Sequence, residues 1–260
     1  MALPPRVDAA AAARDAPVAG AAALACLVEF LAARAVPGVE EVVDGVYRRT
    51  IAGGRVIGLG APEAAPILGA DPGPADAHLG RDPVLGPLVV RRPGLRVPGT
   101  VDGGELAIRA VIGQQISVAA ARTIAGRLVA IAGRPLPEPV GTLTHVWPSP
   151  AAIAEAAPAL PMPRSRRRTV AALAEAVAGG LRLERGGDAR AELLALPGIG
   201  PWTAEYIAMR ALGDPDAWMP TDLGVRHGLA RLGVGAGAAD SWRPYRAHAV
   251  MHLWSALSDP

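Results

Sequence analysis

Beyond residue 101, apolar residues recur at intervals of three and four, which is the spacing of amphipathic helices. Ser149 followed by Pro150 adds a helix start, because serine caps a helix well and proline suits its first position. We interpret the proline-rich stretch over 135–148 as a connector. The pattern predicts helices at 105–112, 117–131, 166–178, 189–196, 201–212, 222–232 and 241–257.

The first hundred residues mix helical and extended patterns. Residues 21–36 are apolar enough for a helix, which the following Pro-Gly pair would end. Residues 42–51 have β-branched character, a Gly-Gly pair at 53–54 offers a turn, and 55–59 resume the strand pattern. We therefore expect a hairpin on an α/β unit, and an α+β fold in which an antiparallel sheet precedes an all-helical array.

Glycine and proline interrupt this pattern over 69–87 and again over 92–99, where we expect irregular structure and a domain boundary. The length of 260 residues predicts two or three compact units, and 51% apolar residues can bury a sizeable core. No apolar run reaches the roughly 20 residues needed to cross a bilayer, and the N-terminus is typical of a loose tail rather than a signal peptide. We expect a cytoplasmic protein.

Two residue types limit the chemistry. Cys26 is the only cysteine, so the chain cannot form an internal disulfide, ligate an iron–sulfur cluster through thiolates or build a zinc site with several cysteines. Lysine is absent, which excludes a Schiff-base nucleophile of that type. The net charge of +2 permits a nucleic-acid partner without requiring one.

The most informative segment runs from Leu196 to Ala204, with the sequence Leu-Pro-Gly-Ile-Gly-Pro-Trp-Thr-Ala. Gly198 and Gly200 let the backbone approach a partner closely, and the free N–H groups of the following helix start can bind a phosphate. A Gly-x-Gly alone also fits an ordinary tight turn, but the longer motif resembles the helix-hairpin-helix DNA glycosylases. That resemblance implies that the hairpin binds the DNA backbone and that its carbonyls, at Leu196 and Ile199, hold a monovalent cation.

The second hallmark of that superfamily is an aspartate shortly after the hairpin, and Asp222 lies 20 positions beyond Trp202. An aspartate here can also cap the next helix, and the two roles can coexist. Breaking an N-glycosidic bond develops positive charge on the sugar, which a fixed carboxylate stabilises. Bifunctional relatives carry a hairpin lysine, whose position here corresponds to Trp202, so the resemblance implies water as the nucleophile and no lyase activity.

Four further stretches resemble the bacterial inducible 3-methyladenine DNA glycosylase II family, of the AlkA type: 30–36, 92–99, 112–118 and 252–254. The resemblance implies excision of alkylated bases from double-stranded DNA by base flipping, in a monomer without a catalytic cofactor. It implies three parts: an N-terminal domain over 1–80 with 1–18 as a tail, one helical subdomain over 81–102 plus 215–260, and another over 103–214. The implied roles are catalysis by Asp222, a base pocket of Trp202, Tyr206, Trp254 and Phe30, and DNA contacts by Gly198, Gly200, Thr203, Gln115 and Arg246. For Arg246, support of Asp222 is the alternative role.

Gln115 would fill the gap left by the flipped base, where some relatives carry leucine. The arginine-rich segment 164–168 fits either a DNA-facing surface or a solvated helix face. His248 and His252 have metal-ligand spacing, but Ala249 stands where a zinc protease motif needs glutamate, so buried or surface histidines are favoured over a metal site.

Two alternative functions stay open, and a third, a methyl-accepting protein, is disfavoured. A non-catalytic DNA-binding protein would use the hairpin as a clamp and release no base. A methyl-accepting protein would need a reactive thiol, and no His, Arg or Lys stands beside Cys26 in the sequence to activate it. A mismatch or oxidised-base glycosylase of the same superfamily would share the hairpin and aspartate but remove a different base.

Overall fold

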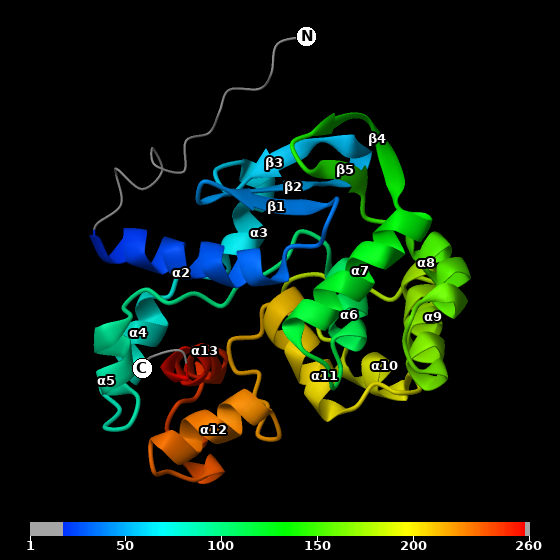
Figure 1. Ribbon diagram of the computed structural model, residues 1–260. Helices are drawn as coiled ribbons and strands as arrows, with labels where there is room; N and C mark the ends of the chain where they lie inside the picture. The colour runs from blue at the N-terminus through cyan, green and yellow to red at the C-terminus, as the bar shows by residue number, and fades with distance from the viewer. Residues whose placement is uncertain (1–17, 258–260) are drawn as a thin grey trace.

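The computed structural model describes residues 18–257, and the tail predicted over 1–18 lies outside this range except for its last residue. A small antiparallel sheet covers one side of a helical body (Figure 1). The helices of this part of the chain include α2 (Val18–Arg34), α6 (Gly103–Ile112), α7 (Val118–Ala132), α8 (Pro150–Ala156), α9 (Arg164–Ala178), α10 (Arg190–Ala195), α11 (Pro201–Ile207), α12 (Leu223–Arg231) and α13 (Arg246–Ala256).

The N-terminal sheet contains β1 (Glu40–Val43), β2 (Val46–Thr50) and β3 (Val56–Gly58), all antiparallel. A single strand over 42–51 was the wrong prediction, because Asp44 and Gly45 form a two-residue turn with φ of 51° and 74°. Asp-Gly favours this turn, since both residues tolerate positive φ and the turn's twist matches that of paired strands. The predicted turn at 53–54 does separate β2 from β3.

A second hairpin, β4 (Arg134–Val140) and β5 (Leu143–Val146), occupies the stretch expected to be an irregular connector. The prolines at alternate positions of β4 supply no N–H, and a two-stranded hairpin tolerates them because each strand has a free edge. Its apolar face buries Leu136 and Leu143 against Val56 of the first sheet. The prolines therefore misled the prediction.

Two helix predictions also need correction. The region 69–87 contains α4 (Gly73–Leu79) and the start of α5 (Gly86–Arg91), each with a proline in its first turn, where no N–H is needed. The last helix begins at Arg246 rather than at 241, because Pro244 would remove a helical hydrogen bond. The start predicted at Ser149 is confirmed, with its hydroxyl accepting a bond from the Ala152 N–H at 3.3 Å.

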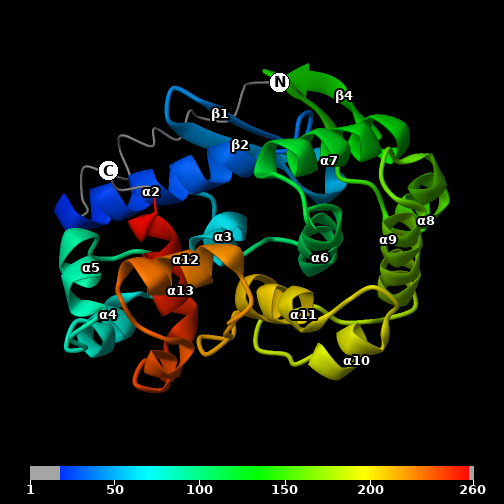
Figure 2. The same cartoon turned by 60° about the horizontal axis from the view of Figure 1, so that its bottom comes forward.

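One large apolar core extends from Val36 to Ala256, and α6 runs through it, with residues 105–108 and 110–112 buried. In Figure 2, α4, α5, α12 and α13 form a group on one side of α6 and α11, while α7, α8 and α9 form the other. The site lies where these two groups meet.

In residues 18–257, no helix combines the length and apolar character needed to span a membrane.

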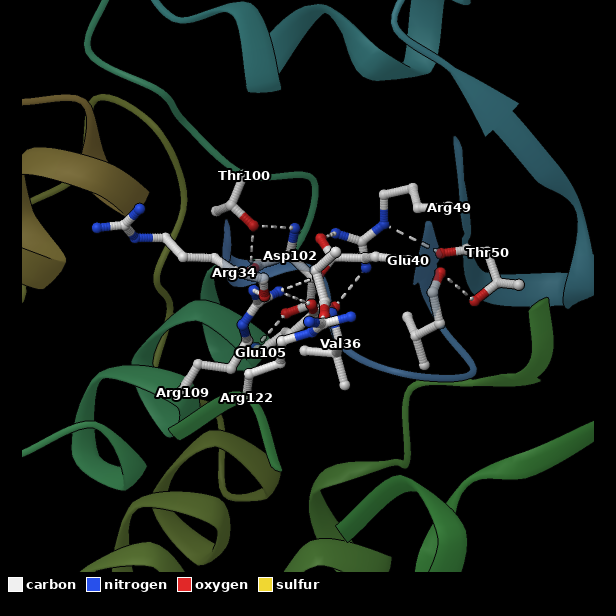
Figure 3. Close-up of polar contacts among 12 residues, drawn as sticks. Arg34, Val36, Glu40, Arg49, Thr50, Thr100, Asp102, Glu105, Arg109 and Arg122 are labelled. Atoms are coloured by element: carbon white, nitrogen blue, oxygen red, sulfur yellow. Dashed lines mark hydrogen bonds and ion pairs between the residues drawn. The ribbon is translucent and has the colours of Figure 1, made fainter. Parts of the chain in front are cut away.

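A buried ion network joins the N-terminal sheet to α6 (Figure 3). Arg49 contacts Glu105 at 2.5 Å, and Arg109 contacts both Glu40 at 2.9 Å and Glu105 at 2.8 Å. Burial alone would raise the pKa of Glu40, but Arg109 and Arg49 outweigh it and lower that pKa. Arg109 also donates to the Arg34 carbonyl at the end of α2, at 2.7 Å, so the network fixes the sheet and α2 against the helical body. Glu40, Arg49 and Arg109 line the cavity of the site.

Candidate active site

The hairpin between α10 and α11 has one glycine with positive φ, Gly198, whereas Gly200 is extended, with φ of −100°. Gly198 has φ of +83°, and a Cβ built there would lie 2.1 Å from Thr169 Oγ1, so this position accepts only glycine. A Cβ on Gly200 would meet no atom within 4 Å, so the start of α11 faces open space. Ile199, between them, is 5% exposed and anchors the turn in the core. The hairpin is thus rigid and open to a phosphate at the same time.

Asp222 caps α12 and also receives two indole N–H groups. Its Oδ1 accepts bonds from the Val225 N–H at 2.9 Å and Trp254 Nε1 at 2.8 Å. Its Oδ2 accepts one from Trp202 Nε1 at 2.9 Å. Hydrogen bonds to a charged acceptor are the strong ones, so three donors from α11, α12 and α13 hold this carboxylate in one orientation. Capping therefore coexists with a position suited to catalysis.

Gly224 is the residue that lets Trp254 reach Asp222. A Cβ built on Gly224 would lie 2.6 Å from Cδ1 and 2.9 Å from Nε1 of the Trp254 indole. Real Cβ atoms do not approach so closely, so only glycine leaves room for the indole against the first turn of α12.

Three aromatic side chains form a continuous wall beside this carboxylate. Trp202 and Tyr206, four residues apart on α11, stack with ring centroids 5.4 Å apart and planes 15° apart. Trp254 on α13 lies next, with its centroid 6.5 Å from that of Tyr206. These rings are partly exposed toward one cavity, so they are available to a ligand and are not merely core residues.

The cavity has a volume of about 470 Å³, within the usual range for small-molecule sites. It is lined by Asp222 and the three aromatic residues, and by Phe30 on α2. The guanidinium of Arg34 covers one face of the Phe30 ring, 3.7 Å from its centroid. The structure thus brings every predicted pocket residue to one cavity, with Phe30 already stacked by a cation.

Arg210 ties together three walls of this cavity. It is 4% exposed, donates to Tyr206 Oη at 2.8 Å and to the carbonyl of Pro98, and lies 4.9 Å from the Phe30 centroid. Burial would raise the pKa of the Tyr206 hydroxyl, but the positive charges of Arg210, Arg34 and Arg109 outweigh it and lower that pKa. Arg210 belongs to a π-helical turn, Ala208–Leu212, of the kind that often marks functional sites.

The loop that leads to Asp222 is held by ion pairs. Arg190 pairs with Asp214 and with Glu205, and Arg246 makes a bidentate pair with Asp216, both N–O distances being 2.7 Å. Asp214 and Asp216 therefore hold the loop through ion pairs, and Asp214 also accepts a bond from the Asp216 N–H at 2.8 Å, as acids in turns do. The Arg246 guanidinium is engaged by Asp216, so the structure assigns it to the loop and shows no contact with Asp222.

The other predicted DNA contacts differ in their exposure. Gln115 lies exposed at the tip of the loop between α6 and α7, with φ of +57°. Thr203 is 3% exposed and its hydroxyl accepts a bond from Gln114, so its side chain faces inward and cannot meet a phosphate. In the segment 164–168, Arg164 and Arg168 are exposed.

The buried histidines form no metal site. His248 and His252 are 4% and 0% exposed, and burial lowers the pKa of each to about 4. Within residues 18–257, no group of three or more His, Cys, Asp or Glu side chains could hold a metal ion. Cys26 lies outside the lining of the cavity, with its sulfur 4.0 Å from the Arg92 guanidinium.

The cation implied at the hairpin carbonyls requires oxygen donors, and the turn supplies them. The Leu196 carbonyl accepts the Ile199 N–H at 3.2 Å and keeps a second lone pair. Carbonyl oxygens suit Na⁺ or K⁺, and a bound cation would brace the turn. Occupancy by a cation stays a prediction.

Comparisons with known proteins agree with this geometry. The fold matches that of a 3-methyladenine DNA glycosylase from Archaeoglobus fulgidus, with a TM-score of 0.72 and 23% identity over 89% of this chain and 93% of that one. It also matches an 8-oxoguanine glycosylase/lyase from Clostridium acetobutylicum, bound to double-stranded DNA, with a TM-score of 0.68 and 16% identity over 85% of this chain and 88% of that one. The fold is therefore that of the helix-hairpin-helix DNA glycosylases.

Comparison of sequences identifies a family within this class of DNA glycosylases. Residues 68–102 match the AlkA N-terminal domain. The chain is 34% identical to DNA-3-methyladenine glycosylase 2 of Escherichia coli over 88% of this chain and 92% of that protein. It belongs to the AlkA family of DNA-3-methyladenine glycosylases.

A second relative is longer than this chain. The probable bifunctional transcriptional activator/DNA repair enzyme AlkA of Mycobacterium tuberculosis is 45% identical over 88% of this chain. The match covers 54% of that protein, so the chain spans about half the length of this relative.

Sequence reasoning missed three residues that shape the site: Gly224, Arg210 and Gln114. Arg210 carried a usable signal, because it lies four positions after Tyr206 and so shares its helix face. Gly224 and Gln114 act through partners on other elements, and no local pattern identifies such contacts.

Proposed function

We propose that this protein is a monofunctional DNA glycosylase, which hydrolyses the N-glycosidic bond of alkylated bases, 3-methyladenine and related purines, in double-stranded DNA. The observation that carries the proposal is the Asp222 carboxylate, held by two indole N–H groups at the wall of an aromatic cavity. The relatives named as 3-methyladenine glycosylases support the same substrate class.

The chemistry follows from charge. As the bond between the sugar C1′ and the base nitrogen breaks, its electron pair leaves with the base and positive charge develops on the sugar. A fixed carboxylate beside that sugar stabilises the charge, and a water oxygen then bonds to C1′ and loses a proton. Bases alkylated on a ring nitrogen already carry positive charge, so they leave readily and are attracted to the faces of Trp202, Tyr206 and Trp254.

The hairpin supports the DNA-binding part of the proposal. The open start of α11 offers N–H groups to a phosphate, and a base rotated out of the duplex at a cost of a few kcal/mol can enter the cavity. We propose that the protein acts as a monomer. The sequence contains no lysine, so strand nicking through a lysine Schiff base is closed to this chain.

The experiment is product analysis on methylated duplex DNA. The proposal predicts release of 3-methyladenine as a free base, with strands that stay intact until alkali cleaves the abasic sites. Immediate nicking would refute the monofunctional assignment. Binding without base release would favour the non-catalytic clamp, and release of oxidised bases alone would favour the oxidised-base glycosylase.

A further inference from the structure

The loop that carries Gln115 is pinned at both ends. It spans the four residues between the end of α6 at Ile112, which is 0% exposed, and Ser117, which caps α7 by accepting a bond from the Ala120 N–H at 3.2 Å. Gln115 at its tip has φ of +57°, a conformation that non-glycine residues seldom adopt. Such strain persists only where the surroundings enforce it, and it concentrates at functional sites.

The preceding residue, Gln114, points the other way, into the hairpin. Its Nε2 donates to the Gly198 carbonyl at 3.1 Å and to Thr203 Oγ1 at 3.0 Å. These partners lie 84 and 89 residues away along the chain and sit on the hairpin and on the first turn of α11. One amide group thus uses both of its hydrogens to join the loop after α6 to the hairpin and to α11.

Both partners of Gln114 are themselves fixed. Gly198 packs against Thr169 of α9, so the hairpin carbonyl cannot move away without breaking that contact. Thr203 is buried at 3% exposure in the first turn of α11. The two hydrogen bonds of Gln114 therefore fix the loop tip at a set position relative to the hairpin.

We propose that Gln114 is a positioning residue that sets the distance between the phosphate-binding hairpin and the side chain of Gln115. This inference rests on the proposed function. A side chain that enters the base stack must arrive at a defined spacing from the phosphates that the hairpin holds, because misplacement by about 1 Å can cost two orders of magnitude in rate. Gln114 sets that spacing, and the side chain of its neighbour Gln115 fills the gap that the flipped base leaves in the base stack.

The test separates base flipping from base release. A duplex with 2-aminopurine beside the alkylated base reports unstacking by fluorescence in stopped flow, and released base is measured in the same reaction. Gln114→Met keeps the side-chain length and removes both donors, while Thr203→Val removes one acceptor without changing shape. We expect Gln114→Met to lower the equilibrium constant for base flipping about tenfold, because it removes two neutral hydrogen bonds. Thr203→Val removes one of these bonds and should lower the constant about threefold.

The matched control is Thr123→Val, which removes an exposed hydroxyl bonded only within α7, to the Ala119 carbonyl at 3.0 Å. Affinity for undamaged duplex should stay within twofold in all three variants, because the hairpin glycines are intact. The double variant Gln114→Met/Thr203→Val should lose no more than Gln114→Met alone, since the shared bond is already gone.

Flipping within twofold of wild type in both folded variants would overturn the positioning role, as would an equal loss in Thr123→Val. If Gln114→Met does not fold, Thr203→Val decides the matter. Failure of the proposed function has a different signature, because the wild-type protein would then release no alkylated base.

Discussion

Replacing Gly224 by alanine should move the Trp254 indole away from Asp222 and slow excision. The new Cβ would lie 2.6 Å from Trp254 Cδ1, and ordinary contact begins at 3.4 Å, so the indole must retreat by about 0.8 Å. The bond from Trp254 Nε1 to Asp222 Oδ1, now 2.8 Å, would lengthen beyond hydrogen-bonding range. A bond to a charged acceptor contributes roughly 1.5–3 kcal/mol, so the excision rate should fall roughly 10- to 150-fold.

Alanine also favours the helix at this position by roughly 0.5–1 kcal/mol over glycine, which offsets part of the strain. The lost bond also stabilises the folded state, so we expect the free energy of unfolding to fall by about 0.5–2.5 kcal/mol in urea titrations, beside the loss in single-turnover excision. Gly237→Ala is the matched control, because a Cβ there meets no atom within 4 Å. An excision rate within twofold of wild type would refute the view that the Trp254 indole orients Asp222.

Three further predictions concern the buried charges. Glu105→Gln leaves Arg49 and Arg109 to share the single carboxylate of Glu40, so one positive charge of the network loses its partner and the free energy of unfolding should fall by about 3–5 kcal/mol in urea titrations; a loss below 1 kcal/mol would contradict this. Arg210→Met frees the Tyr206 hydroxyl and should slow excision about tenfold with unchanged DNA affinity, whereas an unchanged rate would remove Arg210 from the site. Burial lowers the pKa of His248 and His252 from 6.5 to about 4, so the unfolded chain binds more protons between these values; stability should fall as pH drops from 6.5 toward 4, and His252→Leu should weaken that dependence.

Local patterns sufficed for much of the fold and failed where two signals competed. The helical spacing beyond residue 101 and the cap at Ser149 identified most helices, because both signals lie within one turn of chain. The β4–β5 hairpin was missed because its prolines suggested a connector, although the hairpin's free edges tolerate them. The Asp44–Gly45 turn was overlooked inside a β-branched run.

Some residues of the site could likewise be predicted from local sequence patterns, and others could not. Asp222, Trp202 and Tyr206 could be predicted, since they belong to a dense motif or follow it at a characteristic spacing. The inward-facing Thr203 and the pairing of Arg246 with Asp216 could not, because each depends on a partner that only the tertiary fold supplies. Gly224 was beyond reach for the same reason: its close approach to Trp254 crosses from α12 to α13.

The most direct test of the account is single-turnover excision of 3-methyladenine by Asp222→Asn, beside Asp240→Asn as an exposed isosteric control. The substitution keeps the shape and removes the negative charge. We expect a loss of about 10²–10³-fold or more, the scale for removing one electrostatic stabiliser, with DNA affinity within a few-fold of wild type and normal activity in the control. Excision by Asp222→Asn within threefold of the wild-type rate would contradict the claim that this carboxylate stabilises the sugar cation.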